Sequence, residues 1–209
     1  MTDFASVHAA SKIKLFQELV ILLETKAWSS DIISQAESNC SLDSGYHHVL
    51  FSDGESQILQ EFETWQDDLM LEILAKQEKP QKIRAQIALA LETRLMHIAS
   101  KNTVINSSAA FLLPQNILTG NEAACRTCDF IWKYAGDKST DFNYYTKRGL
   151  LLPVYLSARA FYIADNSKNH GDTKYFIKNA LDNIINIASF KNRIKLPKLE
   201  DIPILRLFS

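Results

Sequence analysis

The chain has 209 residues, of which 46% are hydrophobic and 22% are charged, and its formal net charge at pH 7 is −1. This composition is ordinary for a globular protein and excludes an intrinsically disordered chain. Six glycines and five prolines are few for this length, and because sheet proteins need many turns, the scarcity favours an all-α fold.

The first part of the chain is expected to form a head of three short helices. Apolar residues recur at three- and four-residue steps over about residues 10–25, which predicts an amphipathic helix. A serine at its start favours a second helix over about 29–38, and residues 41–51 form a short third segment. With a longer helical register over 58–76, this order resembles a helix-turn-helix head.

The rest of the chain is expected to form a larger helical body and an irregular tail. Apolar periodicity and breaks at proline and glycine predict five further helices, over about residues 80–98, 102–113, 116–134, 141–165 and 173–189. The longest nearly uncharged apolar run, residues 149–164, is shorter than the roughly 20 residues that span a bilayer. We therefore expect a soluble protein with a head over 1–52, a body over 53–190 and a tail over 191–209.

The charge is unevenly distributed between the two parts. The first 70 residues carry twelve acidic and three basic side chains, a net charge of −9, and the rest of the chain carries +8. Proteins that bind DNA gain affinity by placing lysine and arginine against phosphates. Residues 41–51, where a recognition helix would lie, contain neither, so the sequence predicts no nucleic-acid binding.

No catalytic or metal-binding motif stands out in the sequence. Glycine-rich phosphate loops, a G-x-S-x-G turn and an H-E-x-x-H helix are absent. Cys125 and Cys128 have the spacing of half a zinc site, but no second pair completes four ligands, and packed thiols are the better reading. We therefore expect no catalytic residue, no metal and no cofactor, and a protein that is not an enzyme.

One segment carries a specific resemblance. Residues 135–148 read AGDKSTDFNYYTKR and match throughout the pattern A-G-D-x-S-T-D-F-N-x-Y-T-x-R. That pattern is the signature of the ubiquinone-biosynthesis accessory family named for its ninth Coq protein, and the similarity covers about residues 10–190. The resemblance implies a TetR-like fold, with a three-helix head on a larger body that dimerises through its last two long helices.

The resemblance also implies a function without catalysis. Members of the family bind an isoprenoid lipid or ubiquinone precursor and present it to a partner, the di-iron demethoxyubiquinone hydroxylase. Carried over residue by residue, the partner-binding patch falls on Asp129, Ile131, Tyr144 and Tyr145, and Arg148 is expected to pair with acidic groups of the partner or with lipid headgroups. The alternatives are a solvated charge for Arg148, and simple packing for the other aromatic residues in and just before the signature, Trp132, Tyr134 and Phe142.

The apolar run after the signature is the expected wall of the lipid site. Leu151, Val154, Tyr155 and Ala158 share one helix face, and Pro153 removes a backbone hydrogen bond and favours a kink beside them. The alternative for these four residues is an ordinary core position or a dimer interface.

The tail is the expected site of membrane contact. Its basic residues Lys191, Arg193 and Lys195 directly follow Phe190, and this combination suits an anionic membrane surface. Its two prolines break a long helix, and folding back onto the body is the alternative. The first residues resemble neither a secretory signal nor an arginine-rich transit peptide. We expect a cytoplasmic bacterial protein peripheral to the inner membrane, or one on the mitochondrial matrix side if organellar.

The alternative function is a TetR-type ligand-responsive transcriptional regulator.

Overall fold

The computed structural model describes residues 3–140 and 142–193. Across these residues the ordered elements are helices, which confirms the all-α fold, and the chain contains no strand there. The elements are α1 (Asp3–Leu22), α2 (Ser30–Asn39), α3 (His47–Leu50), α4 (Glu55–Ala75), α5 (Ile83–Met96), α6 (Lys101–Ala110), η1 (Pro114–Asn116), α7 (Ile117–Tyr134), α8 (Phe142–Ala164), η2 (Lys168–His170) and α9 (Gly171–Arg193). The TetR-like topology stays a prediction.

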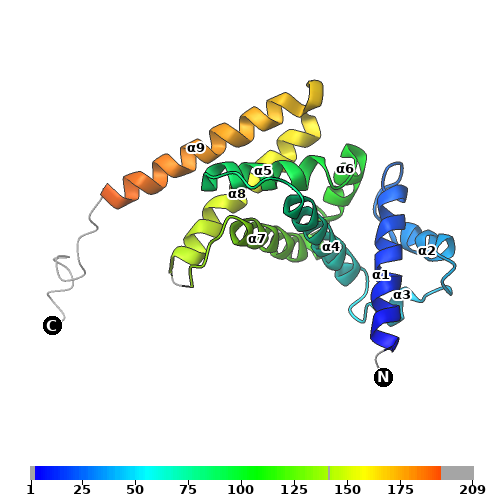
Figure 1. The fold of residues 1–209 in the computed structure, drawn as a ribbon. Coiled ribbons are helices and arrows are strands. Elements are labelled where there is room, and N and C mark those ends of the chain that lie inside the picture. Colours follow the sequence, from blue (N-terminus) through cyan, green and yellow to red (C-terminus); the bar gives the residue numbers. More distant parts are fainter. Residues whose placement is uncertain (1–2, 141, 194–209) are drawn as a thin grey trace, which may run out of the picture.

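Helices α1, α2 and α3 form a small head at one end of the molecule (Figure 1). Their apolar faces meet around Phe16, whose ring centre lies 5.9 Å from that of Phe51 and 5.9 Å from that of Phe62. Phe62 belongs to α4, and Trp65 of the same helix also contacts Phe16. The first half of α4 therefore completes the head core.

A buried carboxylate fixes the short turn between α2 and α3. Glu37 is 1% exposed and accepts the backbone N–H of Gly45 at 3.1 Å and that of His47 at 2.5 Å. Its Oε1 also lies 2.7 Å from Nδ1 of His47. Burial alone would raise the pKa of Glu37, but these hydrogen bonds outweigh it and lower the pKa. His47 therefore ties α2 to α3.

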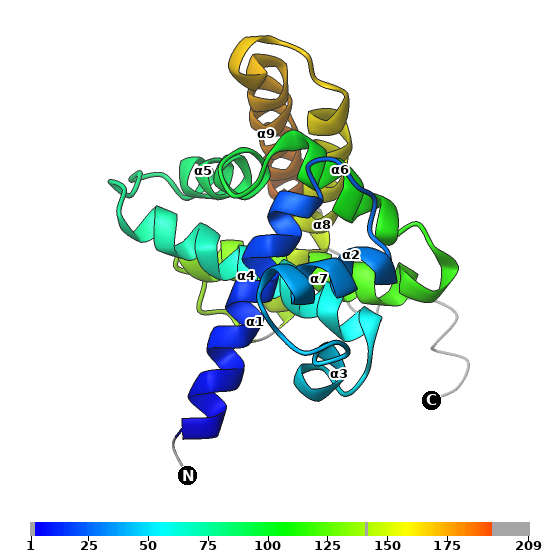
Figure 2. The ribbon, with the colours of Figure 1, turned by 90° about the vertical axis from the view of Figure 1, so that its right-hand side faces the viewer.

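Helices α4, α5, α7, α8 and α9 form the larger body around a second core. This core contains Met70 and Leu74 of α4, Leu91 of α5, Ile131 of α7 and Tyr155 of α8, all at most 1% exposed. The first half of α9 packs on α5 and α8, whereas its second half extends away from the body (Figure 1). In the 90° view of Figure 2, α4 crosses behind α1. Helix α4 thus supplies both cores, and the boundary expected at residue 52 stays a prediction.

A charge network lies where α4, α5, α7 and α8 meet. Arg94 of α5 pairs with Glu63 at 2.6 Å and with Asp67 at 2.7 Å, and Arg159 of α8 pairs with Glu63 at 3.1 Å. Thr127 of α7 donates to Asp67 at 2.9 Å. Buried charges persist only when they are paired and hydrogen-bonded, so the network fixes how these helices pack together.

The helix ends differ from the expected ones in a few places. α1 begins at Asp3 rather than near residue 10, and α5 begins at Ile83 rather than at Pro80. α6 ends at Ala110 instead of continuing to residue 113, and α9 reaches Arg193 instead of ending at 189. Within the described residues, no helix combines the length and the apolar character that crossing a membrane requires.

Candidate functional site

The turn between α7 and α8 brings the signature segment to one corner of the body. α7 ends at Tyr134, and Gly136 takes a φ of +82°, which glycine adopts without strain. The chain then reverses into α8, so that Arg148 of α8 lies beside Asp129 of α7, with 2.7 Å between Nε and Oδ1. We call Asp129, Lys133, Tyr144, Tyr145 and Arg148 the signature corner.

Arg148 holds this corner together. Its Nη1 donates to Asp137 at 2.8 Å and to the backbone oxygen of Tyr144 at 3.1 Å. Its guanidinium carbon lies 3.5 Å from the centre of the Tyr144 ring, and the Tyr144 hydroxyl donates to Asp129 at 3.2 Å. Burial alone would lower the pKa of Arg148, but Asp137 and Asp129 outweigh it and raise the pKa. Arg148 is therefore paired within its own chain.

Asp137 is the acceptor that organises the turn. It is 3% exposed and accepts hydrogen bonds from Lys147 at 2.5 Å and from the Ser139 hydroxyl at 2.7 Å, besides the one from Arg148. Burial alone would raise the pKa of Asp137, but the bonds from Lys147, Ser139 and Arg148 hold the pKa well below its ordinary value. Asp137 therefore binds side chains of the turn itself and of α8.

The part of the corner that faces outward is aromatic with charges beside it. Tyr145 is 72% exposed, and its ring meets the half-buried ring of Tyr144 edge-on at 5.2 Å. Lys133 is 60% exposed and pairs with Asp129 at 2.7 Å. Aromatic side chains rimmed by charge are typical of the residues that dominate binding at protein interfaces.

Ile131 does not share this outward face. It is 0% exposed and belongs to the body core, so the expectation that it lies on the surface patch is wrong. The reason is its place on α7: Asp129 and Lys133, four residues apart, share the outer face, and Ile131 lies between them on the opposite side. Trp132 and Tyr134 pack against the core, as the alternative reading held. The side chain of Phe142 lies outside the described part.

The four residues expected to line a lipid site are core residues. Leu151, Val154, Tyr155 and Ala158 are all at most 6% exposed, and they belong to the body core. None of them lines the large pocket that the structure contains. These four residues thus occupy core positions and their expected contact with a lipid stays a prediction, whereas the other face of α8 forms the pocket.

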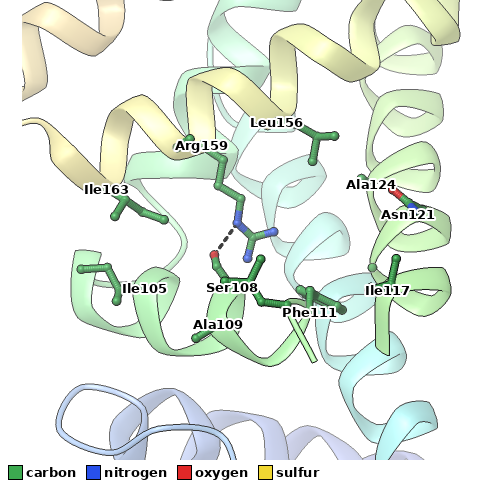
Figure 3. A pocket seen from close by; sticks show the side chains of 13 residues that line it. Ile105, Ser108, Ala109, Phe111, Ile117, Asn121, Ala124, Leu156, Arg159 and Ile163 are labelled. Atoms are coloured by element: carbon green, nitrogen blue, oxygen red, sulfur yellow. Dashed lines mark hydrogen bonds between the residues drawn. The ribbon is translucent and has the colours of Figure 1, made fainter. Parts of the chain in front are cut away.

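That pocket lies between α6, α7 and α8 and has a volume of about 630 Å³. Figure 3 shows side chains of the three helices pointing into it. The wall is mainly apolar and includes Ile105, Ala109, Phe111, Ile117, Leu156 and Ile163. Ser108, Asn121 and Arg159 supply its polar groups. An apolar pocket of this size with a few polar groups is the usual form of a small-molecule site.

The pocket depends on a close approach between the end of α6 and α7. A Cβ atom placed on Gly120 would lie 2.7 Å from a ring carbon of Phe111 and 3.0 Å from the Phe111 Cβ. Only glycine therefore lets α7 pass Phe111 without moving it. The sequence reading missed this site, although residues 102–121 contain no charged side chain and Arg159 is the lone charge in the apolar run 149–164.

The rim of the pocket exposes large apolar side chains to water. Leu112 and Leu118 are 81% and 75% exposed, and Leu113 and Ile117 are 44% and 48% exposed. These residues flank η1, at the connection between α6 and α7. Because Leu112 and Ile117 also line the pocket, the apolar surface continues from the interior to the outside.

The residues expected to touch a membrane lie at the end of the described part. Phe190, Lys191 and Arg193 fall in the last turns of α9, and their side chains lie outside what the structure describes. Lys195 lies beyond the described residues altogether. Their expected role stays a prediction.

The described residues contain no cluster of three or more histidine, cysteine or acidic side chains that could hold a metal ion. Cys125 is exposed, whereas Cys128 is buried in the body core. Burial raises the pKa of the Cys128 thiol, so at neutral pH it is a protonated, packed side chain.

Comparisons with known proteins give relatives of one kind. The protein-family model described as COQ9 matches residues 118–188, which include the signature and part of the pocket. The chain is 30% identical over 198 residues to the probable ubiquinone biosynthesis protein coq9, mitochondrial, of Dictyostelium discoideum, covering 88% of this chain and 62% of that protein.

Two vertebrate proteins with the same kind of name are also similar to this chain. Identity is 33% over 163 residues to COQ9-A of Xenopus laevis, covering 74% of this chain and 51% of that protein. It is 27% over 177 residues to human COQ9, covering 80% and 55%. The chain thus spans little more than half the length of these relatives, all named as mitochondrial ubiquinone biosynthesis proteins. The chain is therefore a homologue of the COQ9 ubiquinone biosynthesis proteins, which confirms the resemblance carried by residues 135–148.

Proposed function

We propose that this chain is a non-catalytic accessory protein of ubiquinone biosynthesis that binds an isoprenoid quinone precursor. The names of its relatives support the pathway, and the apolar pocket between α6, α7 and α8 supports the ligand. The pocket is the observation that carries the proposal, because about 630 Å³ lies within the usual range for sites that bury a small molecule.

The rim gives a reason to favour a ligand with a long apolar tail. A quinone ring and the start of its chain fill the pocket, and the rest of the chain leaves over Leu112 and Leu118, which are otherwise exposed to water. Burying apolar surface contributes roughly 25 cal/mol per Å². A prenyl chain thus gains affinity both inside the pocket and on its rim.

Delivery to the di-iron demethoxyubiquinone hydroxylase is the second part of the proposal. The signature corner and the pocket use the same two helices: α7 carries Asp129 and Ile117, and α8 carries Tyr145 and Leu156. A partner docked on Tyr144 and Tyr145 therefore contacts the helices that hold the ligand. Asp129 and Arg148 support these rings from beneath.

A homodimer peripheral to a membrane belongs to the same proposal. The relatives of this chain are named mitochondrial, which favours the matrix side of the inner membrane. A bacterial homologue would act on the cytoplasmic side. The transcriptional-regulator alternative is not carried further: the acidic first 70 residues oppose a DNA duplex, and the relatives named above are biosynthesis proteins.

The ligand is tested by blocking the pocket. Ala160 lines it on α8, whereas Ala164, one turn further along the same helix, does not. Protein purified from a quinone-making host is extracted with organic solvent, and the extract is analysed by mass spectrometry. We expect isoprenoid quinones from wild type and from Ala164→Trp, and a loss of at least tenfold from Ala160→Trp. Equal amounts from all three proteins, or none from wild type, would contradict a lipid site in this pocket.

The partner is tested by pull-down with the purified hydroxylase. Tyr145→Ala removes an exposed ring without touching the body core, so we expect most of the binding to be lost while the folded state is unchanged. Tyr175→Ala on α9, with a ring 68% exposed, is the matched control. Undiminished capture by Tyr145→Ala would remove the signature corner from the proposal.

A further inference from the structure

One charged side chain stands in the wall of the apolar pocket. Arg159 is the charged residue among those that line it, and its side chain is 12% exposed. Figure 3 shows its guanidinium reaching from α8 into the space between Leu156 and Ser108. The pairing with Glu63 explains why the charge is buried but not its place in the pocket wall, because an apolar ligand alone gains nothing from a charge there.

The guanidinium makes two hydrogen bonds of good length, and its other contacts are longer. Its Nε donates to the Ser108 hydroxyl at 2.8 Å, and its Nη2 donates to Glu63 at 3.1 Å. The remaining contacts are long: Nη1 lies 3.4 Å from Glu63 and 3.5 Å from the Tyr155 hydroxyl, and Nη2 lies 3.4 Å from Ser107. Good hydrogen bonds of this kind measure about 2.7–3.2 Å. Nη1 therefore has donor capacity that the protein itself does not use well.

The charges around Arg159 already balance. Two guanidinium groups, Arg94 and Arg159, face two carboxylates, Glu63 and Asp67. Burial raises the pKa of Asp67, but Arg94 and Thr127 both donate to it, as donors do to an ionised carboxylate. A ligand carboxylate or phosphate would add a negative charge beside Glu63, and a ligand cation would meet Arg159. A neutral oxygen acceptor adds no charge.

Resting on the proposed function, we infer that Arg159 recognises a neutral carbonyl or ether oxygen of an aromatic or quinone ring through its Nη1 group. The apolar wall holds the ring and the start of its chain, and the guanidinium fixes which edge of the ring faces α8. Glu63 and Ser108 position Arg159 by holding the other nitrogen atoms. The pocket thereby distinguishes an oxygenated ring from a plain hydrocarbon of the same shape.

Three probes with one decyl chain separate the ligand classes. Decylubiquinone carries neutral ring oxygens, decylbenzene carries none, and para-decylbenzoate carries a carboxylate. Their affinities are measured by displacement of a fluorescent apolar dye from the full chain. For wild type we expect decylubiquinone to bind about tenfold more tightly than decylbenzene, the usual effect of one hydrogen bond from a charged donor. We expect no such preference for para-decylbenzoate.

The variant Arg159→Met keeps an unbranched stem and removes the guanidinium with its donors. We expect the preference for decylubiquinone over decylbenzene to fall about tenfold, with decylbenzene binding unchanged. Because Arg159→Met leaves Glu63 with one partner fewer, the double variant Glu63→Gln/Arg159→Met tests the same loss with the charges balanced. Arg84→Met, an exposed arginine on α5 that pairs with Asp182, is the control and is expected to behave as wild type.

The outcomes separate this inference from the proposed function. An equal loss for decylubiquinone and decylbenzene in both Arg159 variants would overturn it, because Arg159 would then only shape the wall. Tight binding of para-decylbenzoate that depends on Arg159 would overturn the neutral class of ligand. If wild type binds none of the three probes, the pocket is not a lipid site and the proposed function itself fails.

Discussion

At the scale of single residues, paired charges hold the functional surfaces in place. Arg148 joins α7 to α8 through Asp129 and Asp137 and lies against the ring of Tyr144. Tyr145, its neighbour on the corner, is 72% exposed. The same short segment therefore contains one residue that supports the fold and one that is free to meet a partner.

This difference predicts that one substitution lowers the stability of the fold and that another leaves it almost unchanged. Arg148→Met leaves two carboxylates short of a donor and is expected to lower the free energy of unfolding by about 2 kcal/mol. Tyr145→Ala changes an exposed site and is expected to stay within about 0.5 kcal/mol of wild type. Urea unfolding followed by circular dichroism measures both. Similar losses in the two variants would contradict the division of roles.

Asp165 predicts a pH dependence of stability. It accepts the backbone N–H of Ser167 at 2.7 Å and that of Thr173 at 2.9 Å, at the start of α9. Burial alone would raise its pKa, but the bonds from Ser167 and Thr173 lower the pKa well below its ordinary value of 3.8. The stability that the ionised Asp165 contributes is therefore complete above about pH 4 and is lost as the pH falls further.

The variant Asp165→Asn tests this contribution. At pH 7 we expect it to unfold about 1–3 kcal/mol more easily than wild type, since an amide oxygen is a weaker acceptor than a carboxylate. The difference should shrink as the pH falls below 4, where wild type loses the same interaction. Unfolding curves at several pH values measure it, and a difference independent of pH would show that the charge of Asp165 does not matter.

At the scale of helices, apolar periodicity predicted the elements well and their contacts poorly. The spacing of apolar side chains located most of the helices, and the signature marked the corner between α7 and α8. The pocket was missed because a helix with two apolar faces, such as α8, does not reveal which face meets a neighbour. Leu151 and Leu156 lie five residues apart in the same run, yet one is core and the other lines the pocket.

Ends of helices also escaped prediction where side chains from elsewhere decide them. Pro80 suggested the start of α5, but the backbone oxygen of Pro80 instead accepts a hydrogen bond from Gln86 and the helix begins at Ile83. Glu63 and Arg159 are 96 residues apart, and nothing local in the sequence marks them as partners. Long-range charge pairs of this kind can be found only once the fold is known.

Two helical glycines give a matched prediction. A Cβ on Gly120 of α7 would overlap with Phe111, whereas a Cβ on Gly149 of α8 would meet nothing within 4 Å. Alanine favours a helix over glycine by about 1 kcal/mol. We therefore expect Gly149→Ala to stabilise the protein by about 0.5–1 kcal/mol, and Gly120→Ala to destabilise it by about 1–3 kcal/mol through overpacking. Thermal unfolding compares them, and stabilisation by both would mean that Phe111 moves freely.

At the scale of the whole molecule, α4 makes the head and the body one unit. Its first half packs into the head core through Ile58 and Phe62, and its second half packs into the body core through Met70 and Leu74. A helix shared by two cores couples their unfolding, because fraying it exposes both. The head also holds α6, which forms one wall of the pocket, because Thr103 and Asn106 of α6 donate to the backbone oxygens of Val20 and Leu23.

This coupling predicts a single unfolding transition. Trp28 and Trp65 pack on the head core and Trp132 packs on the body core, so Trp132→Phe leaves fluorescence that reports on the head alone. In that background we expect fluorescence and circular dichroism to give the same midpoint. Phe62→Ala, which removes a ring buried in the head, should lower both midpoints together, at a cost of about 3–5 kcal/mol. Separate midpoints would show two independent domains.

The two exposed leucines beside the pocket also favour self-association of the protein in concentrated solution. Leu112 and Leu118 lie on an uncharged tip, so neither charge repulsion nor hydration keeps the tips of two molecules apart. Empty protein is therefore expected to form reversible clusters at high concentration. Dynamic light scattering should show these clusters dispersing when Leu112 and Leu118 are both replaced by serine, or when a mild detergent covers the tip.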